Sequence, residues 1–297
     1  MDNNEKFIIL SDGTIYDGIG FGSDKEVLGE IVFNTSMTGY QEMLTDPSYR
    51  GQILVSTYPM IGNYGIDNNF SESKRIQVKS YVVRDLCDYP FHFSNDKDLN
   101  KFLTENEIPG IHSVDTRSLT RKIRKFGSKM AIVTSNPDIN TALDKINNFG
   151  SYEDNNYVDQ VSVKSIESYQ AKQSHLKIAL IDFGVKKNII RILNSRGCDV
   201  EVYPWNFDFN NLDLNKFDGI VMSPGPGDPK TLLNDIKGIK KSIENIPTLG
   251  ICLGHQIIAH IYGGETFKLL FGHRGGNQPV KEIISGRVYP CLLYTSP

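Results

Sequence analysis

The sequence predicts an α/β protein with an N-terminal mixed α/β domain followed by a doubly wound domain whose sheet is mostly parallel. In the second half of the 297-residue chain, short β-rich apolar segments alternate with amphipathic helical segments, a pattern typical of a parallel sheet with helices on both faces. In the first half, strand-like segments are separated by turns rich in Gly, Asn and Asp. We place the domains at residues 1–150 and 176–297 and expect a polar linker over 151–175.

Composition excludes several classes of protein. Hydrophobic residues form 39% and charged residues 23% of the chain, which indicates a globular protein. The net charge is only −3, so the overall electrostatic potential of the protein does not favour nucleic acid or a membrane surface as a partner. No apolar stretch approaches the roughly 20 residues that span a bilayer, and the N-terminus lacks the order of a signal peptide. The four cysteines are scattered, so we expect a cytoplasmic protein without a metal site.

The first half contains four predicted strands and one clear helix. The strands are expected at 6–13, 29–36, 51–59 and 76–83. The helix begins after Asp115, a capping residue, and Gly127 ends it. Its other face carries basic side chains, which we interpret as a solvated face or a protein contact rather than a nucleic-acid stripe, because no aromatic residues are interleaved: Arg117, Arg121, Lys122, Arg124 and Lys125.

The second half contains four predicted strands that alternate with helices. The strands are expected at 177–183, 199–205, 218–224 and 247–253. A helix over 186–196 ends at Gly197, and another is expected over 231–245 behind the capping pair Asp228-Pro229. Ligands of such sheets bind at the carboxyl ends of the strands. The segments MSPGPGDP and GICLGHQ both follow strands, so they should lie at one edge of one sheet.

Cys252 lies between two glycines in the segment GICLGHQ. The pattern G-x-C-x-G has the form of the G-x-S-x-G nucleophile elbow, in which glycines let a strand turn sharply into a helix. A helix over 255–262 follows at once, and its dipole favours the thiolate. The N–H of Leu253 is placed to bind an oxyanion, and the Gly225-Pro226-Gly227 loop offers a second donor. A cysteine that only packs a core does not need these surroundings, so we predict a nucleophile.

Two motifs resemble the class I glutamine amidotransferases, the elbow Gly250–Gln256 and the P-G-P-G-D-P segment Pro224–Pro229. Four further segments are similar to the small subunit of carbamoyl-phosphate synthase, and the first of them is not shared with other amidotransferases: 29–66, 115–133, 181–193 and 271–281. The chain is therefore identified as a member of this small-subunit family. The resemblance implies an amidotransferase domain over 176–297 and a first domain that docks onto a large subunit.

The resemblance also implies the chemistry, which is hydrolysis of L-glutamine with Cys252 as the nucleophile. Gly227 and Leu253 resemble the family's oxyanion-hole donors. Ammonia would pass to the large subunit, which makes carbamoyl phosphate from bicarbonate for arginine and pyrimidine biosynthesis. This subunit is expected to hold no cofactor, with ATP and Mg²⁺ on the large subunit. The positions that resemble those holding the substrate are Ser48, Gly225, Leu253 and Gln256.

The general base of the family's site has no counterpart in these residues. The family takes it from a His-x-Glu pair near its C-terminus, whereas none of the six histidines here is followed two positions later by Glu or Asp. After Tyr289 the sequence PCLLYTSP departs from the family, in which a strand and a Gln-Asn-His-Gly loop are expected. We therefore expect a truncated amidotransferase domain in which Cys291 has no native role.

Two functions of other classes stay open. A stand-alone cysteine amidohydrolase would use the same elbow without a partner, and it gives no reason for the first domain. A catalytically silent assembly subunit would keep only the fold and the partner surface, and the chain end favours it. The use of glutamine or ammonium as nitrogen donor, measured with a large subunit present, separates all three functions.

Overall fold

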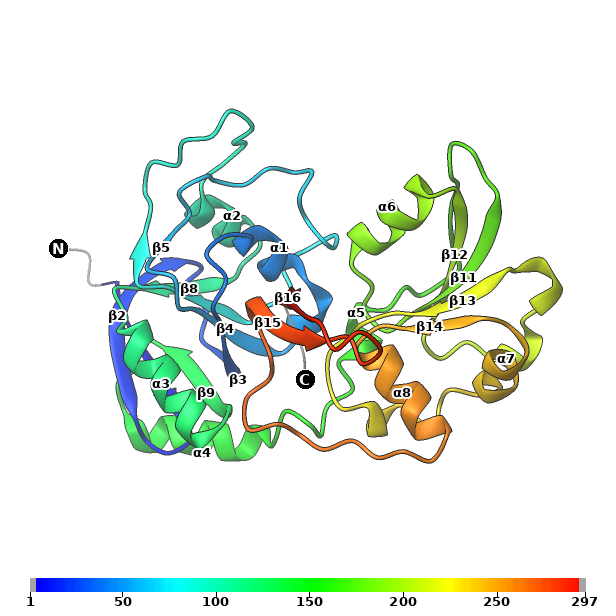
Figure 1. Ribbon diagram of the computed structural model, residues 1–297. Helices are drawn as coiled ribbons and strands as arrows, with labels where there is room; N and C mark the ends of the chain where they lie inside the picture. Colours follow the sequence, from blue (N-terminus) through cyan, green and yellow to red (C-terminus); the bar gives the residue numbers. More distant parts are fainter. Residues whose placement is uncertain (1–3, 294–297) are drawn as a thin grey trace. The chain divides into compact units, whose positions relative to one another are not determined.

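The computed structural model describes residues 4–293 and divides the chain into two compact units (Figure 1). The first unit contains the chain up to Tyr152 together with the segment from Leu269 onward, and the second unit is Glu153–Lys268. Both units contain helices and strands, which confirms the predicted α/β class. Among the described residues, no helix has the length and apolar character needed to cross a membrane.

A closed seven-stranded barrel forms the first unit, in the order β1-β2-β8-β6-β4-β3-β9. The pairs β3–β4, β4–β6 and β6–β8 are parallel, and the other pairs are antiparallel. Strands β1, β3, β4 and β6 coincide with segments predicted from the sequence. The strands are β1 (Glu5–Leu10), β2 (Ile15–Gly22), β3 (Val27–Asn34), β4 (Gln52–Ser56), β6 (Ser80–Val82), β8 (Pro109–His112) and β9 (Lys129–Thr134).

Alternate side chains of the barrel strands gather in one buried cluster, because successive residues of a strand point to opposite faces. Ile8, Ile31 and Ile53 are fully buried in this cluster. Leu119 and Ile123 of α3 (Thr116–Phe126) pack against the same side chains. The helix is therefore anchored on the barrel core.

The structure confirms that α3 is capped by Asp115 and ends at Gly127, as the sequence predicts. The Asp115 carboxylate accepts a hydrogen bond from the N–H of Ser118 at 2.9 Å, and Gly127 follows the helix with a φ of 89°. Other helices and short segments pack against the opposite face of the barrel strands. These are α1 (Tyr40–Thr45), η1 (Pro47–Tyr49), β5 (Met60–Ile61), β7 (Asp85–Leu86), α2 (Leu99–Glu105) and α4 (Ile139–Phe149).

The segment from Leu269 onward clusters with the first unit in the structure. The N–H of Ser128 donates a hydrogen bond to the Leu270 carbonyl at 3.0 Å. The ring of Phe271 lies 5.7 Å from that of Phe33, centroid to centroid. The segment ends in an antiparallel hairpin of β15 (Gly275–Lys281) and β16 (Val288–Leu293). Burial of Phe271 against a barrel residue explains this placement.

The second unit is a five-stranded sheet in the order β10-β12-β11-β13-β14, parallel except at β10. Ile190 of α6 packs with Leu180 on one face, whereas Ile257 of α8 packs with Ile181 on the other. Helices therefore cover both faces, as a doubly wound sheet requires. The elements are β11 (Leu176–Asp182), α6 (Lys187–Ser195), β12 (Cys198–Pro204), β13 (Gly219–Met222), α7 (Ile239–Asn245), β14 (Thr248–Gly250) and α8 (Leu253–Ile261).

The segment predicted as a linker, 151–175, contains regular structure. It forms α5 (Val158–Val161) and β10 (Glu167–Tyr169), and β10 pairs antiparallel with β12. This short polar strand has no apolar periodicity that would predict it. Its backbone hydrogen bonds to β12 hold it in place. Part of the expected linker is therefore an edge of the sheet.

The helix predicted over 231–245 is shorter than expected. Asp228 caps only a single turn, η4 (Pro229–Thr231), where its carboxylate accepts the N–H of Lys230 at 2.9 Å. The helix α7 starts afresh at Ile239, after Gly238 with a φ of 76°. A left-handed residue cannot lie inside an α-helix, so the glycine divides the segment.

We expect Ile53→Ala to destabilise the first unit by about 2–5 kcal/mol, because it leaves a cavity in the barrel core. The matched control is Ile15→Ala, since Ile15 is 39% exposed, and its effect should stay within about 0.5 kcal/mol. Urea unfolding followed by circular dichroism measures the loss. The single tryptophan, Trp205, lies in the second unit, so its fluorescence reports the unfolding of that unit separately. Equal losses for the two variants would contradict the assignment of the barrel face.

Candidate active site

Cys252 occupies a strained turn between a strand and a helix. It follows β14 by two residues and directly precedes α8, with φ of 52° and ψ of −109°. A positive φ is rare for a residue with a Cβ and costs on the order of 1–3 kcal/mol. The side chain is partly exposed rather than buried. This is the geometry of a nucleophile elbow, as the G-x-C-x-G pattern predicts.

The turn is possible because the backbones of α8 and β13 lie very close together. A Cβ on Gly254 would lie 2.3 Å from the Met222 carbonyl oxygen, so only glycine fits there. The N–H of Gly254 donates to the Ser223 carbonyl at 3.1 Å, and that of Ile251 donates to the Met222 carbonyl at 2.9 Å. These contacts fix Cys252 at the carboxyl edge of the sheet.

The Gly225-Pro226-Gly227 loop follows β13 and meets the elbow. A Cβ on Gly225 would lie 2.1 Å from the Phe183 carbonyl oxygen and 2.9 Å from Cδ2 of Leu253. Gly227 has a φ of 88°, a left-handed conformation that favours glycine. The loop and the elbow thus lie side by side at one edge of the sheet, which confirms the prediction for these two segments.

The start of α8 supplies an electropositive environment for Cys252. The helix runs for nine residues from Leu253, and the N–H groups of its first turn have no acceptor within the helix; that of Gly254 donates to the Ser223 carbonyl instead. The helix dipole places partial positive charge at this end and favours a thiolate. A developing oxyanion next to Cys252 would face the same N–H groups.

Gln256 and Ser48 are predicted substrate residues with unsatisfied polar atoms. The N–H of Gln256 donates to the Cys252 carbonyl at 3.0 Å, while its side-chain Oε1 is buried and has no hydrogen-bond partner among the described residues. Ser48 lies in η1 of the first unit, where the Asp46 carboxylate accepts its N–H at 2.9 Å. Its buried hydroxyl likewise has no partner in the described part of the chain. The other predicted site residues all lie in the second unit.

Two polar residues that the sequence analysis did not single out hold the strand ends together. The buried Ser223 hydroxyl accepts the N–H of Phe183 at 2.9 Å and donates to the Pro224 carbonyl at 2.8 Å. Asp182 at the end of β11 accepts N–H groups from Gly184 and Val185 at 2.9 and 2.7 Å, and burial raises the pKa of its carboxyl group. The signal for both was a polar residue directly after an apolar strand.

Two histidines of α8, His255 and His260, lie close to Cys252 in the sequence. The His255 side chain is exposed, and the His260 ring is hydrogen-bonded to the Thr266 hydroxyl at 2.8 Å. Within residues 4–293, no group of three or more His, Cys, Asp or Glu side chains is arranged to hold a metal ion. The side chain of Cys291 lies outside the described residues.

Comparison with known proteins matches both halves of the chain to family models. Residues 8–133 match the carbamoyl-phosphate synthase small chain, CPSase domain, and residues 179–294 match the class-I glutamine amidotransferases. The small chain of carbamoyl phosphate synthase from Clostridium perfringens is 45% identical over 285 residues, which is 95% of this chain and 80% of that protein. The chain belongs to the carbamoyl phosphate synthase small chain family.

Relatives from distant organisms show the same extent of similarity. The small chain from Methanocaldococcus jannaschii is 45% identical over 96% of this chain and 80% of its own length. That from Staphylococcus haemolyticus is 46% identical over 95% of this chain and 76% of its own length. The match to this small chain family therefore covers the barrel as well as the elbow.

We expect Cys252 to react with iodoacetamide at neutral pH at least about tenfold faster than Cys87 and Cys198, because only Cys252 precedes a helix and is held by glycines. Cys198 is buried and serves as the internal control. Mass spectrometry of labelled peptides over time measures the rates. Equal rates, or faster labelling of Cys87, would contradict the elbow.

Proposed function

We propose that this chain is the glutamine-hydrolysing subunit of a carbamoyl-phosphate synthase, with Cys252 as the nucleophile. The observation that carries the proposal is the strained conformation of Cys252 at the start of α8, with a φ of 52°. A cysteine that only packs the core has no need of this strain. Family membership and the amidotransferase match over 179–294 agree with it.

The reaction begins when the thiolate of Cys252 attacks the side-chain amide carbon of glutamine. The carbonyl oxygen becomes an oxyanion, which accepts hydrogen bonds from the N–H groups of Leu253 and Gly227. The C–N bond then breaks, the leaving nitrogen takes up a proton, and ammonia departs from a γ-glutamyl thioester. Water attacks the thioester, which releases glutamate, restores the thiolate and sets free two protons, one of which balances the proton that the leaving nitrogen took up.

The unsatisfied atoms described above suit the substrate. The buried Oε1 of Gln256 is an acceptor without a donor, and glutamine brings ammonium and amide N–H groups. Gly225 keeps the loop close to Leu253, and its lack of a side chain leaves the backbone free to approach a ligand. Ser48 is proposed as a substrate-binding residue from the family resemblance, and its unpaired hydroxyl fits that role.

We also propose that a large subunit accepts the ammonia and makes carbamoyl phosphate from bicarbonate with ATP and Mg²⁺, in the cytoplasm, for arginine and pyrimidine biosynthesis. No cofactor is assigned to this chain. The first unit carries aromatic side chains suited to a protein partner: Tyr89, Phe91 and Phe93 are 90%, 95% and 96% exposed. Aromatic surface of this kind marks interaction sites.

We expect Cys252→Ser to abolish glutamine-dependent synthesis of carbamoyl phosphate and to leave ammonia-dependent synthesis by the complex intact, because only the first requires the thiolate. The test uses a chain extended beyond Tyr289 with the C-terminal segment of a relative, mixed with a large subunit. Cys198→Ser is the control, since Cys198 lies on β12 away from the elbow. Near-normal use of glutamine by Cys252→Ser would show that Cys252 is structural.

We expect the 297 residues alone to turn over glutamine about 10²–10⁴ times more slowly than the extended chain, because they lack the His-x-Glu pair that moves protons in this family. Glutamate release, measured with and without the large subunit, gives the ratio. Equal turnover would place the base within residues 1–297. Turnover independent of the large subunit would favour a stand-alone amidohydrolase. An extended chain that assembles but never uses glutamine would be a silent assembly subunit.

A further inference from the structure

The first unit contains a hollow at the carboxyl ends of its parallel strands. Thr35, Thr57 and Arg84 each follow one of the strands β3, β4 and β6, and α3 follows β8. A cavity of about 580 Å³ is lined by Thr57, Arg84 and residues of α3. A second cavity of about 460 Å³ shares Thr57, Thr120 and Arg124 with it and includes Thr35. We call these two adjoining cavities the arginine hollow.

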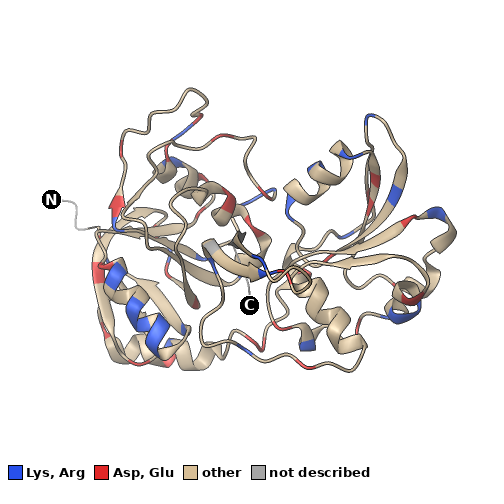
Figure 2. Cartoon of the chain, viewed as in Figure 1, with Lys and Arg blue, Asp and Glu red and all other residues tan. Residues whose placement is uncertain are grey.

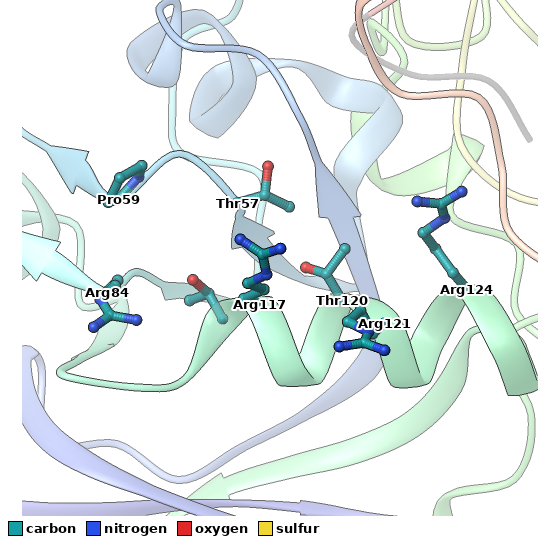
Figure 3. A pocket seen from close by; sticks show the side chains of 8 residues that line it. Thr57, Pro59, Arg84, Arg117, Thr120, Arg121 and Arg124 are labelled. Atoms are coloured by element: carbon teal, nitrogen blue, oxygen red, sulfur yellow. The ribbon is translucent and has the colours of Figure 1, made fainter.

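The lining of the arginine hollow is strongly basic. Arg117, Arg121 and Arg124 lie at positions i, i+4 and i+7 of α3 and so form one stripe, visible as blue segments of α3 in Figure 2. Figure 3 shows them projecting from α3, with Arg84 on a separate segment to one side; Arg84 also lines the first cavity. A fifth guanidinium, that of Arg274, lines the second cavity.

Little acidic charge offsets these arginines. Arg84 has a weak contact with its neighbour Asp85, Nε to Oδ2 at 3.9 Å. In the part of the chain that the structure describes, Arg117, Arg121, Arg124 and Arg274 form no ion pair with a carboxylate. Like charges one turn apart on a helix repel each other, so the stripe destabilises α3 unless an anion compensates it.

Two buried polar atoms in the lining also lack partners. Arg274 is 7% exposed and Thr120 is 9% exposed. Neither Nε of Arg274 nor Oγ1 of Thr120 has a hydrogen-bond partner among the described residues. A buried donor without an acceptor is unfavourable, and both residues line the second cavity. An oxyanion bound there would supply the missing acceptors.

We propose that the arginine hollow binds a phosphate group, either inorganic phosphate or the phosphoryl end of a small phosphorylated metabolite. Guanidinium groups bind phosphate oxygens in pairs, and several of them suit a dianion better than a single carboxylate. Threonine hydroxyls add neutral donors. The cavity volumes lie within the range of small-ligand sites, which favours a small anion over a protein segment. This site does not depend on the proposed glutaminase activity.

Isothermal titration of the 297-residue chain with inorganic phosphate, at constant ionic strength in chloride, tests the proposal. We expect saturable binding at one site. Arg121→Gln should raise the Kd about tenfold, because it removes a charge-assisted contact. Lys125→Gln makes the same charge change on the same helix outside the lining, and it should change the Kd less than twofold. Both side chains are exposed, so neither variant should disturb folding.

Ribose 5-phosphate in a parallel titration separates the two sources of the phosphate group. Tighter binding than that of inorganic phosphate, lost in Arg121→Gln, would assign the site to a phosphorylated metabolite, and the reverse order would assign it to phosphate itself. Absence of saturable binding by both probes, or equal weakening in Lys125→Gln, would overturn the proposal. A glutamate-rich peptide that binds where both phosphate probes fail would assign the hollow to an acidic protein segment instead.

Discussion

The position of Cys252 depends on the close approach of α8 to β13 at Gly254. With no Cβ at this position, the Met222 carbonyl comes within reach of the backbone of the turn, and the next carbonyl accepts the N–H of Gly254. Between β14 and the helix the chain turns sharply at Cys252, which has a positive φ of 52°. The strain at Cys252 is thus sustained by packing of backbone on backbone, which side-chain motion cannot relax.

The fold of the second unit could be predicted from the sequence because its strands and helices are each recognisable from a short stretch of residues. Parallel strands buried on both faces read as apolar runs, and the helices between them carry a clear period. The failures have physical causes. The strand β10 is held by a neighbour's backbone, Gly238 breaks a helix through its φ, and β2 was missed because glycines interrupt its alternation. The contact of the segment after Leu269 with the barrel could not be predicted, because Phe33, the partner of Phe271, lies far back along the chain.

The candidate site also contains residues that the sequence predicts and residues that it does not. Cys252, Leu253 and Gly225 belong to two short motifs at neighbouring strand ends, so spacing and topology were sufficient to bring them together. Ser223 and Asp182 could not be assigned from the sequence, since each accepts a hydrogen bond from a backbone N–H that is distant along the chain, that of Phe183 for Ser223 and that of Val163 for Asp182. The basic face of α3 was visible as a pattern, whereas the hollow beside it also requires Thr57 and Arg274, which are distant in the sequence.

The return of the chain to the first unit after Lys268 makes the second unit an insertion with two connections rather than an appended domain. When such an insertion unfolds while its host stays folded, both of its ends remain attached to the host, and the released chain is a closed loop with fewer conformations than a free tail. The host barrel therefore acts on the inserted sheet as a cross-link would, by lowering the entropy of its unfolded state. The free energy of unfolding of the unit that carries Cys252 therefore depends in part on the barrel being folded.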